Sequence, residues 1–122
     1  ENDDKGSMWS TKHLFDYIHS DIGIPIVFDY HHYKFCTGGQ TEQEALELAM
    51  STWPDGVTPV VHYSQSRAEE HNDPKIRPQA HSDSYWAAPN LYGHDLYVMC
   101  ECKHKEQGVF ALLELMKNKA VA

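Results

Sequence analysis

The stretch IPIVFDYHHYKFCTGGQ, residues 24–40, decides how the rest of the chain is interpreted. Its first part, residues 24–28, is rich in β-branched and aromatic side chains and predicts a buried strand. The chemistry then changes abruptly to DYHH, and strand alternation places Asp29 and Tyr30 on opposite faces. Asp29 and His32, three residues apart at the end of a buried strand, can converge on one ion. The alternative is a polar turn in which Asp29 caps the next helix.

Length and composition limit the class of protein. A chain of 122 residues is the length of one domain, and its net charge of −8 argues against a free basic surface that grips nucleic acid. Metal ions bound among clustered carboxylates would still attract phosphate. No apolar run approaches the roughly 20 residues that cross a membrane, so no membrane partner is expected. The three cysteines cannot all pair with one another, which argues against a disulfide framework and favours a reducing, intracellular setting. They are Cys36, Cys100 and Cys102.

The remaining sequence predicts alternating helices and strands. Ser10 is placed to cap a first helix, and Thr41 with Glu44 forms a capping box before a second helix. A long polar stretch, residues 64–80, is expected to be a surface loop. Alternation of strands and helices indicates an α/β fold with parallel strands. The expected helices are residues 12–19, 42–51 and 105–117, and the expected strands after the first are residues 58–63 and 96–102.

Each predicted strand carries a metal-binding residue type at its carboxyl end, where functional groups gather in parallel α/β folds. Asp29 and His32 follow the first strand, His62 closes the second, and Glu101 lies in the third. The loop before the third strand adds His81 and Asp83. Mixed carboxylate and imidazole ligands suit Mn²⁺, Zn²⁺ or Fe²⁺. A carboxylate inside an apolar strand is also costly unless a cation or hydrogen bonds satisfy it, which favours a function for Glu101.

Other residues of the same types are expected to be structural. Cys100 and Cys102 should pack on the face opposite to Glu101 and not bind metal. His31 should turn away if His32 is the ligand. The histidines on predicted helices and loops are expected to be solvated: His13, His19, His71, His94 and His104.

Five blocks in order carry a family likeness: FDYHHYKF, TGGQTEQEALELAMSTW, PVVHYSQSR, RPQAHSD and VMCECKHKE. They strongly resemble the UV damage endonuclease family. The resemblance implies the C-terminal part of a (β/α)₈ TIM barrel, with parallel strands six to eight and the end of strand five. The barrel would be similar to those of endonuclease IV and xylose isomerase. Residues 1–122 would then be a single partial domain, the C-terminal half of the barrel.

The resemblance also implies an activity and a set of site residues. Members of the family nick DNA on the 5′ side of UV photoproducts with divalent metal ions, preferably Mn²⁺, while Zn²⁺ is a second candidate. Glu1 and Glu101 would be catalytic. Arg67, Lys75 and Arg77 would contact DNA phosphates, although solvated loop charges are an equal interpretation. The metal ligands carried over by motif are Glu1, Asp29, His32, His62, His81 and Glu101.

The expected partner is UV-damaged double-stranded DNA, together with a missing N-terminal half or a second copy of the chain. The expected location is intracellular, cytoplasmic in a prokaryote or virus and nuclear in a eukaryote. Because a whole barrel needs about 250 residues, we expect the chain alone to be a poor nuclease. The alternatives are an abasic-site endonuclease or a sugar isomerase of the same superfamily, and a non-catalytic, metal-binding half-barrel remnant.

Overall fold

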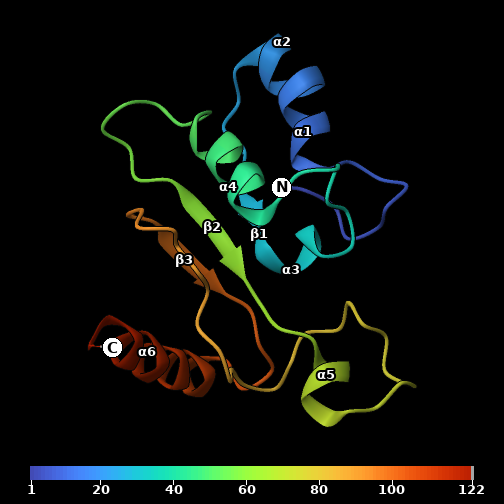
Figure 1. The fold of residues 1–122 in the computed structure, drawn as a ribbon, viewed down its shortest axis with the longest axis vertical. Helices are drawn as coiled ribbons and strands as arrows, with labels where there is room; N and C mark the ends of the chain where they lie inside the picture. The colour runs from blue at the N-terminus through green and yellow to red at the C-terminus, as the bar shows by residue number, and fades with distance from the viewer. Residues whose placement is uncertain (122) are drawn as a thin grey trace. The chain divides into compact units, whose positions relative to one another are not determined.

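A computed structural model describes the backbone of residues 1–121 and the side chains of residues 1–118 (Figure 1). Helices and short strands alternate along most of the chain, as the sequence predicts. The elements in order are α1 (Thr11–His13), η1 (Leu14–His19), α2 (Ser20–Ile22), β1 (Phe28–Asp29), α3 (Tyr30–Tyr33), α4 (Glu42–Met50), β2 (Val60–Tyr63), α5 (Arg67–His71), β3 (Tyr97–Cys100) and α6 (Glu106–Val121).

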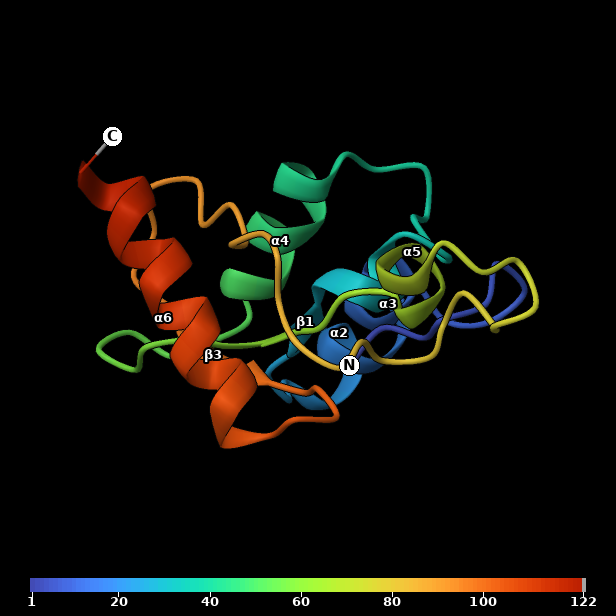
Figure 2. The ribbon, with the colours of Figure 1, turned by 90° about the horizontal axis from the view of Figure 1, so that it is seen from below.

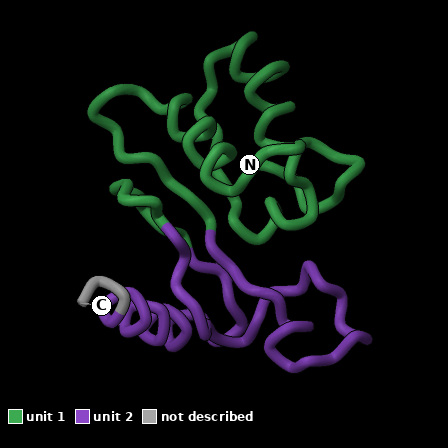
Figure 3. Tube along the Cα trace, viewed as in Figure 1, with its two compact units in different colours: residues 1–62, 91–99 green, residues 63–90, 100–122 purple. Residues whose placement is uncertain are grey.

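The chain divides into two compact units, which Figure 3 shows in different colours. Unit 1 contains Glu1–His62 and Leu91–Met99, and unit 2 contains Tyr63–Asn90 and the chain from Cys100 onwards. Each unit is described by itself below. That residues 1–122 act as one partial domain stays a prediction.

The three strands form one sheet in the order β1-β2-β3. β1 is parallel to β2, with Phe28 opposite Val61 and Asp29 opposite His62. On the other side of β2, the backbone N–H of Tyr97 donates to the carbonyl of Pro59 at 2.9 Å. The register of β1 on β2 is what brings the ends of both strands to the same level.

The core of unit 1 lies between the sheet and α4. Phe28, Leu46 and Val61 are at most 1% exposed. Burying each of these side chains stabilises the fold by about 1.5–3 kcal/mol. The Thr41–Glu44 capping box is present, and α4 ends one residue earlier than predicted, so this helix is confirmed.

The first helix is longer than predicted and changes register along its length. α1, η1 and α2 follow one another along the chain without a break, and η1 is a π-helical segment. The Ser10 hydroxyl accepts the N–H of His13 at 3.2 Å, as expected of a cap. Gly23, with φ of 69°, ends the run because a left-handed residue cannot continue it.

The strand predicted for residues 24–28 is reduced to the two residues of β1, and the expected alternation of Asp29 and Tyr30 is wrong. Tyr30 begins α3 because the Asp29 carboxylate accepts the N–H groups of His31 and His32 and so caps a helix there. The turn interpretation of Asp29 is therefore correct for its local structure. It does not exclude metal binding, because a carboxylate has two oxygens.

Unit 2 also departs from the sequence prediction. Residues 64–80 are not all loop, because α5 forms within them before Asn72, at φ of 48°, ends it. The following stretch, yellow in Figure 2, runs as an irregular loop. Tyr85 stacks on Tyr63 at 5.4 Å between ring centroids and donates its hydroxyl to the Tyr63 carbonyl at 2.8 Å. Glu101 lies just past the end of β3, not inside the strand.

None of the helices within residues 1–121 has both the length and the apolar character needed to span a lipid bilayer. Cys36, Cys100 and Cys102 are free thiols.

Candidate metal centre

Asp29 is held rigidly at the end of β1. It is 2% exposed, and one carboxylate oxygen accepts the backbone N–H groups of His31 and His32, each at 2.9 Å. Asn2 fixes its backbone: the amide Nδ2 donates to the Asp29 carbonyl at 3.0 Å, and the Asp29 N–H donates to Oδ1 at 2.8 Å. The two hydrogen bonds of the Asn2 side chain thus replace those that a further strand beside β1 would make.

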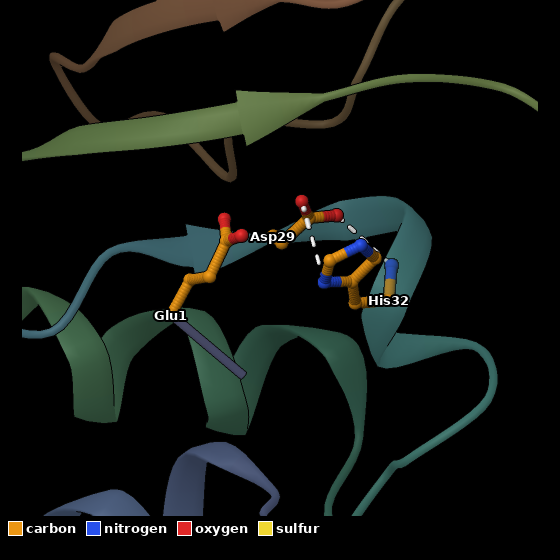
Figure 4. Close-up of side chains that lie close together, drawn as sticks. All are labelled: Glu1, Asp29 and His32. Carbon is orange, nitrogen blue, oxygen red and sulfur yellow. Dashed lines mark hydrogen bonds and ion pairs between the residues drawn. The ribbon is translucent and has the colours of Figure 1, made fainter. Parts of the chain in front are cut away.

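Three further side chains of unit 1 surround this carboxylate. His62 Nδ1 lies 2.5 Å from Glu1 Oε2 and 3.8 Å from Asp29 Oδ2. His32 Nδ1 lies 3.6 Å from the same Asp29 oxygen. Figure 4 shows the carboxylates of Glu1 and Asp29 and the ring of His32 gathered at the end of β1. The pairing of Asp29 with His62 across the sheet explains why residues far apart in sequence meet here.

The backbone carbonyl of Asn2 favours one tautomer of the neutral His32 ring. Its Nδ1 lies 2.8 Å from the backbone carbonyl of Asn2, which can only accept a hydrogen bond. In the neutral tautomer that donates from Nδ1 to this carbonyl, Nε2 would be the nitrogen that keeps a lone pair. His31 beside it is fully buried and packs edge-on against Phe35, 5.2 Å between ring centroids.

Burial raises the pKa of Asp29 above its ordinary value, and the nearby Glu1 carboxylate raises it further. The hydrogen bond from His32, and the proximity of His32 and His62, act in the opposite direction on this pKa. Two carboxylates beside a desolvated position create a demand for positive charge. A divalent cation bound here would supply that charge.

The donor set fits a metal ion. One ligand atom from each of Glu1, Asp29 and His32 lies within 4.8 Å of the others. Carboxylate oxygen and imidazole nitrogen together are typical ligands of divalent transition metals. Four of the six ligands predicted from the sequence, all in unit 1, are thus brought close together: Glu1, Asp29, His32 and His62.

The other two predicted ligands lie in unit 2. His81 Nδ1 is 3.6 Å from Glu101 Oε2, and both side chains line a surface hollow with Lys103 and Lys105. The backbone N–H of Glu101 donates to the Tyr63 carbonyl at 3.2 Å, which fixes Glu101 at the end of the sheet.

The predicted DNA-binding residues differ in their surroundings. Arg67 Nε lies 4.0 Å from Asp83 Oδ1, so part of its charge is balanced within unit 2. Lys75 and Arg77 are exposed in the loop after α5.

Sequence reasoning missed the role of Asn2 and the carboxylate contacts of two histidines outside the centre. Asn2 gave no signal, because it lies in the short acidic run ENDDK and no local pattern there marks a contact with Asp29. His71 was expected to be only solvated; it is exposed, but its Nε2 also lies 2.8 Å from Asp83 Oδ2. His94, likewise expected to be solvated, lies 2.7 Å from Glu47.

Parallel strands joined through helices, with carboxylates and imidazoles at their carboxyl ends, define an α/β protein of the barrel class with a candidate metal centre. The chain belongs to the UV-endonuclease UvdE family, whose model matches residues 1–122. This match confirms the family resemblance that the sequence blocks indicated.

Curated relatives and a solved structure agree with that assignment. The chain is 31% identical to the UV DNA damage endonuclease of Halalkalibacterium halodurans over 98% of its own length and 37% of the relative's. It is 32% identical to the UV-damage endonuclease of Schizosaccharomyces pombe, over 92% of this chain and 19% of that one. The crystal structure of SacUVDE superimposes with a TM-score of 0.75 at 26% identity, covering 98% of this chain and 39% of that one. The prediction of a partial α/β barrel is confirmed, and the chain spans less than two fifths of these proteins.

Proposed function

We propose that this chain is part of a metal-dependent DNA repair endonuclease that nicks DNA on the 5′ side of UV photoproducts by phosphodiester hydrolysis. One observation carries the proposal: Glu1, Asp29 and His32 bring ligand atoms within 4.8 Å of one another in a chain that matches the UvdE model throughout. The relatives named as UV damage endonucleases support the choice of substrate.

The proposed cofactor is a divalent metal ion, Mn²⁺ by preference and Zn²⁺ as the second candidate. The residues of unit 1 that would hold a metal ion are Glu1, Asp29, His32 and His62. The ligands proposed within unit 2 are His81 and Glu101. A bound divalent ion would supply the positive charge that activates water and stabilises the leaving oxygen of the phosphodiester. Asp29 is suited to be a metal ligand, because hydrogen bonds already hold its backbone and one of its carboxylate oxygens. The other carboxylate oxygen is therefore held in a fixed orientation and can bind an ion.

Glu1 and Glu101 are the proposed proton-transfer groups. Their side chains are 38% and 40% exposed, so both can exchange protons with solvent, whereas that of Asp29 is 3% exposed. Each also lies beside a histidine, His62 or His81. A carboxylate paired with an imidazole can take up a proton in a hydrolysis and pass it on.

The proposed DNA contacts come from the loop after α5. Lys75 and Arg77 are exposed and would contact phosphates, and Arg67, whose Nε lies 4.0 Å from Asp83 Oδ1, is the third candidate. Reaching a photoproduct requires the damaged nucleotides to leave the base stack. The substrate is accordingly proposed to be UV-damaged double-stranded DNA.

The test is nicking of UV-irradiated plasmid in Mn²⁺ by the chain joined to the remaining part found in its relatives. We expect Mn²⁺-dependent nicks, lost in Asp29→Asn and kept in Asp55→Asn, because Asp55 is an exposed turn residue. Cleavage of abasic but not irradiated plasmid would favour an abasic-site endonuclease, and turnover of an aldose a sugar isomerase. Mn²⁺ binding with no turnover of any of these substrates would identify a non-catalytic remnant.

The chain alone is proposed to be a poor nuclease that needs an N-terminal half or a second copy. Tyr97 and Met99 on β3 are 66% and 52% exposed, which is unusual for a strand in a finished α/β sheet. Strong, Mn²⁺-dependent nicking by the 122-residue chain on its own would contradict this part of the proposal.

A further inference from the structure

A second group of metal-binding side chains lies within unit 2, and none of its three members is among the six ligands carried over by motif. Glu70 and His71 are adjacent at the end of α5, and Asp83 lies twelve residues further along, in the stretch that precedes β3. One ligand atom from each residue lies within 4.8 Å of the other two. We propose that Glu70, His71 and Asp83 form a site for a divalent ion of the zinc class.

The geometry is close to that of a three-ligand site. His71 Nε2 faces both carboxylates, 2.8 Å from Asp83 Oδ2 and 3.4 Å from Glu70 Oε1. Ligand bonds of about 2.0–2.2 Å at tetrahedral angles separate ligand atoms by about 3.4 Å. A metal ion therefore fits between these atoms after His71 and Asp83 move apart by about half an ångström, a shift that side-chain rotation supplies.

The local structure holds two of the ligands in place. Glu70 Oε1 accepts the backbone N–H of Asp83 at 2.7 Å, and Oε2 accepts that of Ser84 at 3.0 Å. These bonds fix the Glu70 carboxylate against the segment that carries Asp83, and second-shell hydrogen bonds of this kind orient metal ligands. Each Glu70 oxygen keeps a second lone pair for a ligand, because a carboxylate oxygen carries two.

The chemistry of the group selects the ion. One imidazole and two carboxylates match zinc, whereas magnesium and calcium prefer oxygen alone. The Glu70 and Asp83 side chains are 19% and 25% exposed and that of His71 is 43% exposed, so an ion can enter and keep water as a fourth ligand. Arg67, with Nε 4.0 Å from Asp83, offsets part of the negative charge without occupying the oxygen that faces His71.

Binding at this site would tie α5 to the segment that holds His81. The backbone of Ser66 already pairs with His81 in an antiparallel bridge, and Arg67 donates its N–H to the Ala80 carbonyl at 2.9 Å. An ion on Glu70, His71 and Asp83 would add a second connection, between the residues that flank the loop of residues 72–82. The site is therefore structural and lies outside the proposed catalytic ligand set.

The experiment is a calorimetric titration of the metal-free 122-residue chain with Zn²⁺ alone. In His71→Gln the side-chain amide can still donate a hydrogen bond to Asp83 but no longer offers an imidazole nitrogen. The contact between residues 71 and 83 is therefore kept while the metal ligand is lost. We expect this variant to bind one zinc ion fewer than the wild type. The matched control is His94→Gln, because His94 also lies against an exposed carboxylate, Glu47, at 2.7 Å but is not part of any three-ligand group among the described residues. It should bind as the wild type does.

Unchanged zinc stoichiometry and affinity in His71→Gln would overturn the proposal. A measurement on the wild type keeps it testable if that variant does not fold: zinc should shift the ¹⁵N resonance of His71 Nε2, and no shift at saturation would also overturn it. Asp29→Asn separates this site from the proposed function, because it should leave the His71-dependent zinc ion bound.

Discussion

Replacing Asn2 tests how the candidate metal centre is held together. Asn2 is 1% exposed, and its amide makes two hydrogen bonds to the backbone of Asp29. Asn2→Ala removes both partners and leaves the N–H and carbonyl of a buried residue unsatisfied. No other strand is paired with β1 on that side among the described residues, since β1 is the edge of the sheet.

The magnitude follows from the two bonds. Each buried backbone group left without a partner costs about 1–3 kcal/mol, so Asn2→Ala should lower the free energy of unfolding by about 2–4 kcal/mol after partial relaxation. Against a total stability of about 5–15 kcal/mol, this is a large fraction. Asn2→Asp should cost at least as much, because its second oxygen faces the Asp29 carbonyl.

The assay is urea unfolding followed by tryptophan fluorescence and circular dichroism. Asn118→Ala is the matched control, since Asn118 is exposed on α6 and its loss should change the free energy by less than about 0.5 kcal/mol. An Asn2→Ala protein within about 0.5 kcal/mol of the wild type would refute the reasoning.

Three further predictions concern the framework of unit 1. Gly38→Ala should lower the free energy of unfolding in urea by about 1–2 kcal/mol more than Gly39→Ala does. Both glycines have positive φ, but only at Gly38 would the new Cβ come within 2.6 Å of Ser10 Oγ. The Glu44 carboxylate accepts the N–H of Thr41, which lowers the pKa of Glu44 from the ordinary 4.5. The capping box therefore stabilises the fold fully above about pH 4.5 and loses this effect as the pH falls through the lower pKa that Glu44 has in the folded protein. Glu44→Gln should remove that part of the acid dependence, and an unchanged stability profile below pH 4.5 would contradict it. Trp53→Phe should lose about 1 kcal/mol with the bond from Nε1 to the Ile26 carbonyl, whereas Trp86→Phe, at an exposed position, should change little.

The sequence was sufficient to predict the parallel arrangement and the meeting of strand ends. Asp29 and His62 follow buried, β-branched runs, and in a parallel sheet such ends lie at one edge, which the register confirms. The Thr41–Glu44 capping box and the Ser10 cap depend only on residues three apart, so they too could be predicted from the sequence. Local patterns and a general rule about strand ends explain these successes.

The features that the sequence did not reveal depend on longer-range contacts. Asn2 bonds to Asp29 across 27 residues, and no local pattern marks an asparagine that replaces a strand. α5 is short, with no side-chain cap bond from Ser66, so its residues resemble loop. β1 is short because the Asp29 side chain begins a helix at once, a competition between strand and cap that composition alone does not resolve.

Mn²⁺ binding by the 122-residue chain tests the central claim most directly. Free Mn²⁺ gives an electron paramagnetic resonance signal that weakens when the ion binds to protein, so titration measures the affinity without any substrate. We predict that the wild type and Asp55→Asn bind Mn²⁺ equally, that His71→Gln keeps the Asp29-dependent ion, and that Asp29→Asn loses it. Equal Mn²⁺ binding by Asp29→Asn and the wild type would contradict the assignment of Glu1, Asp29, His32 and His62 as a metal centre.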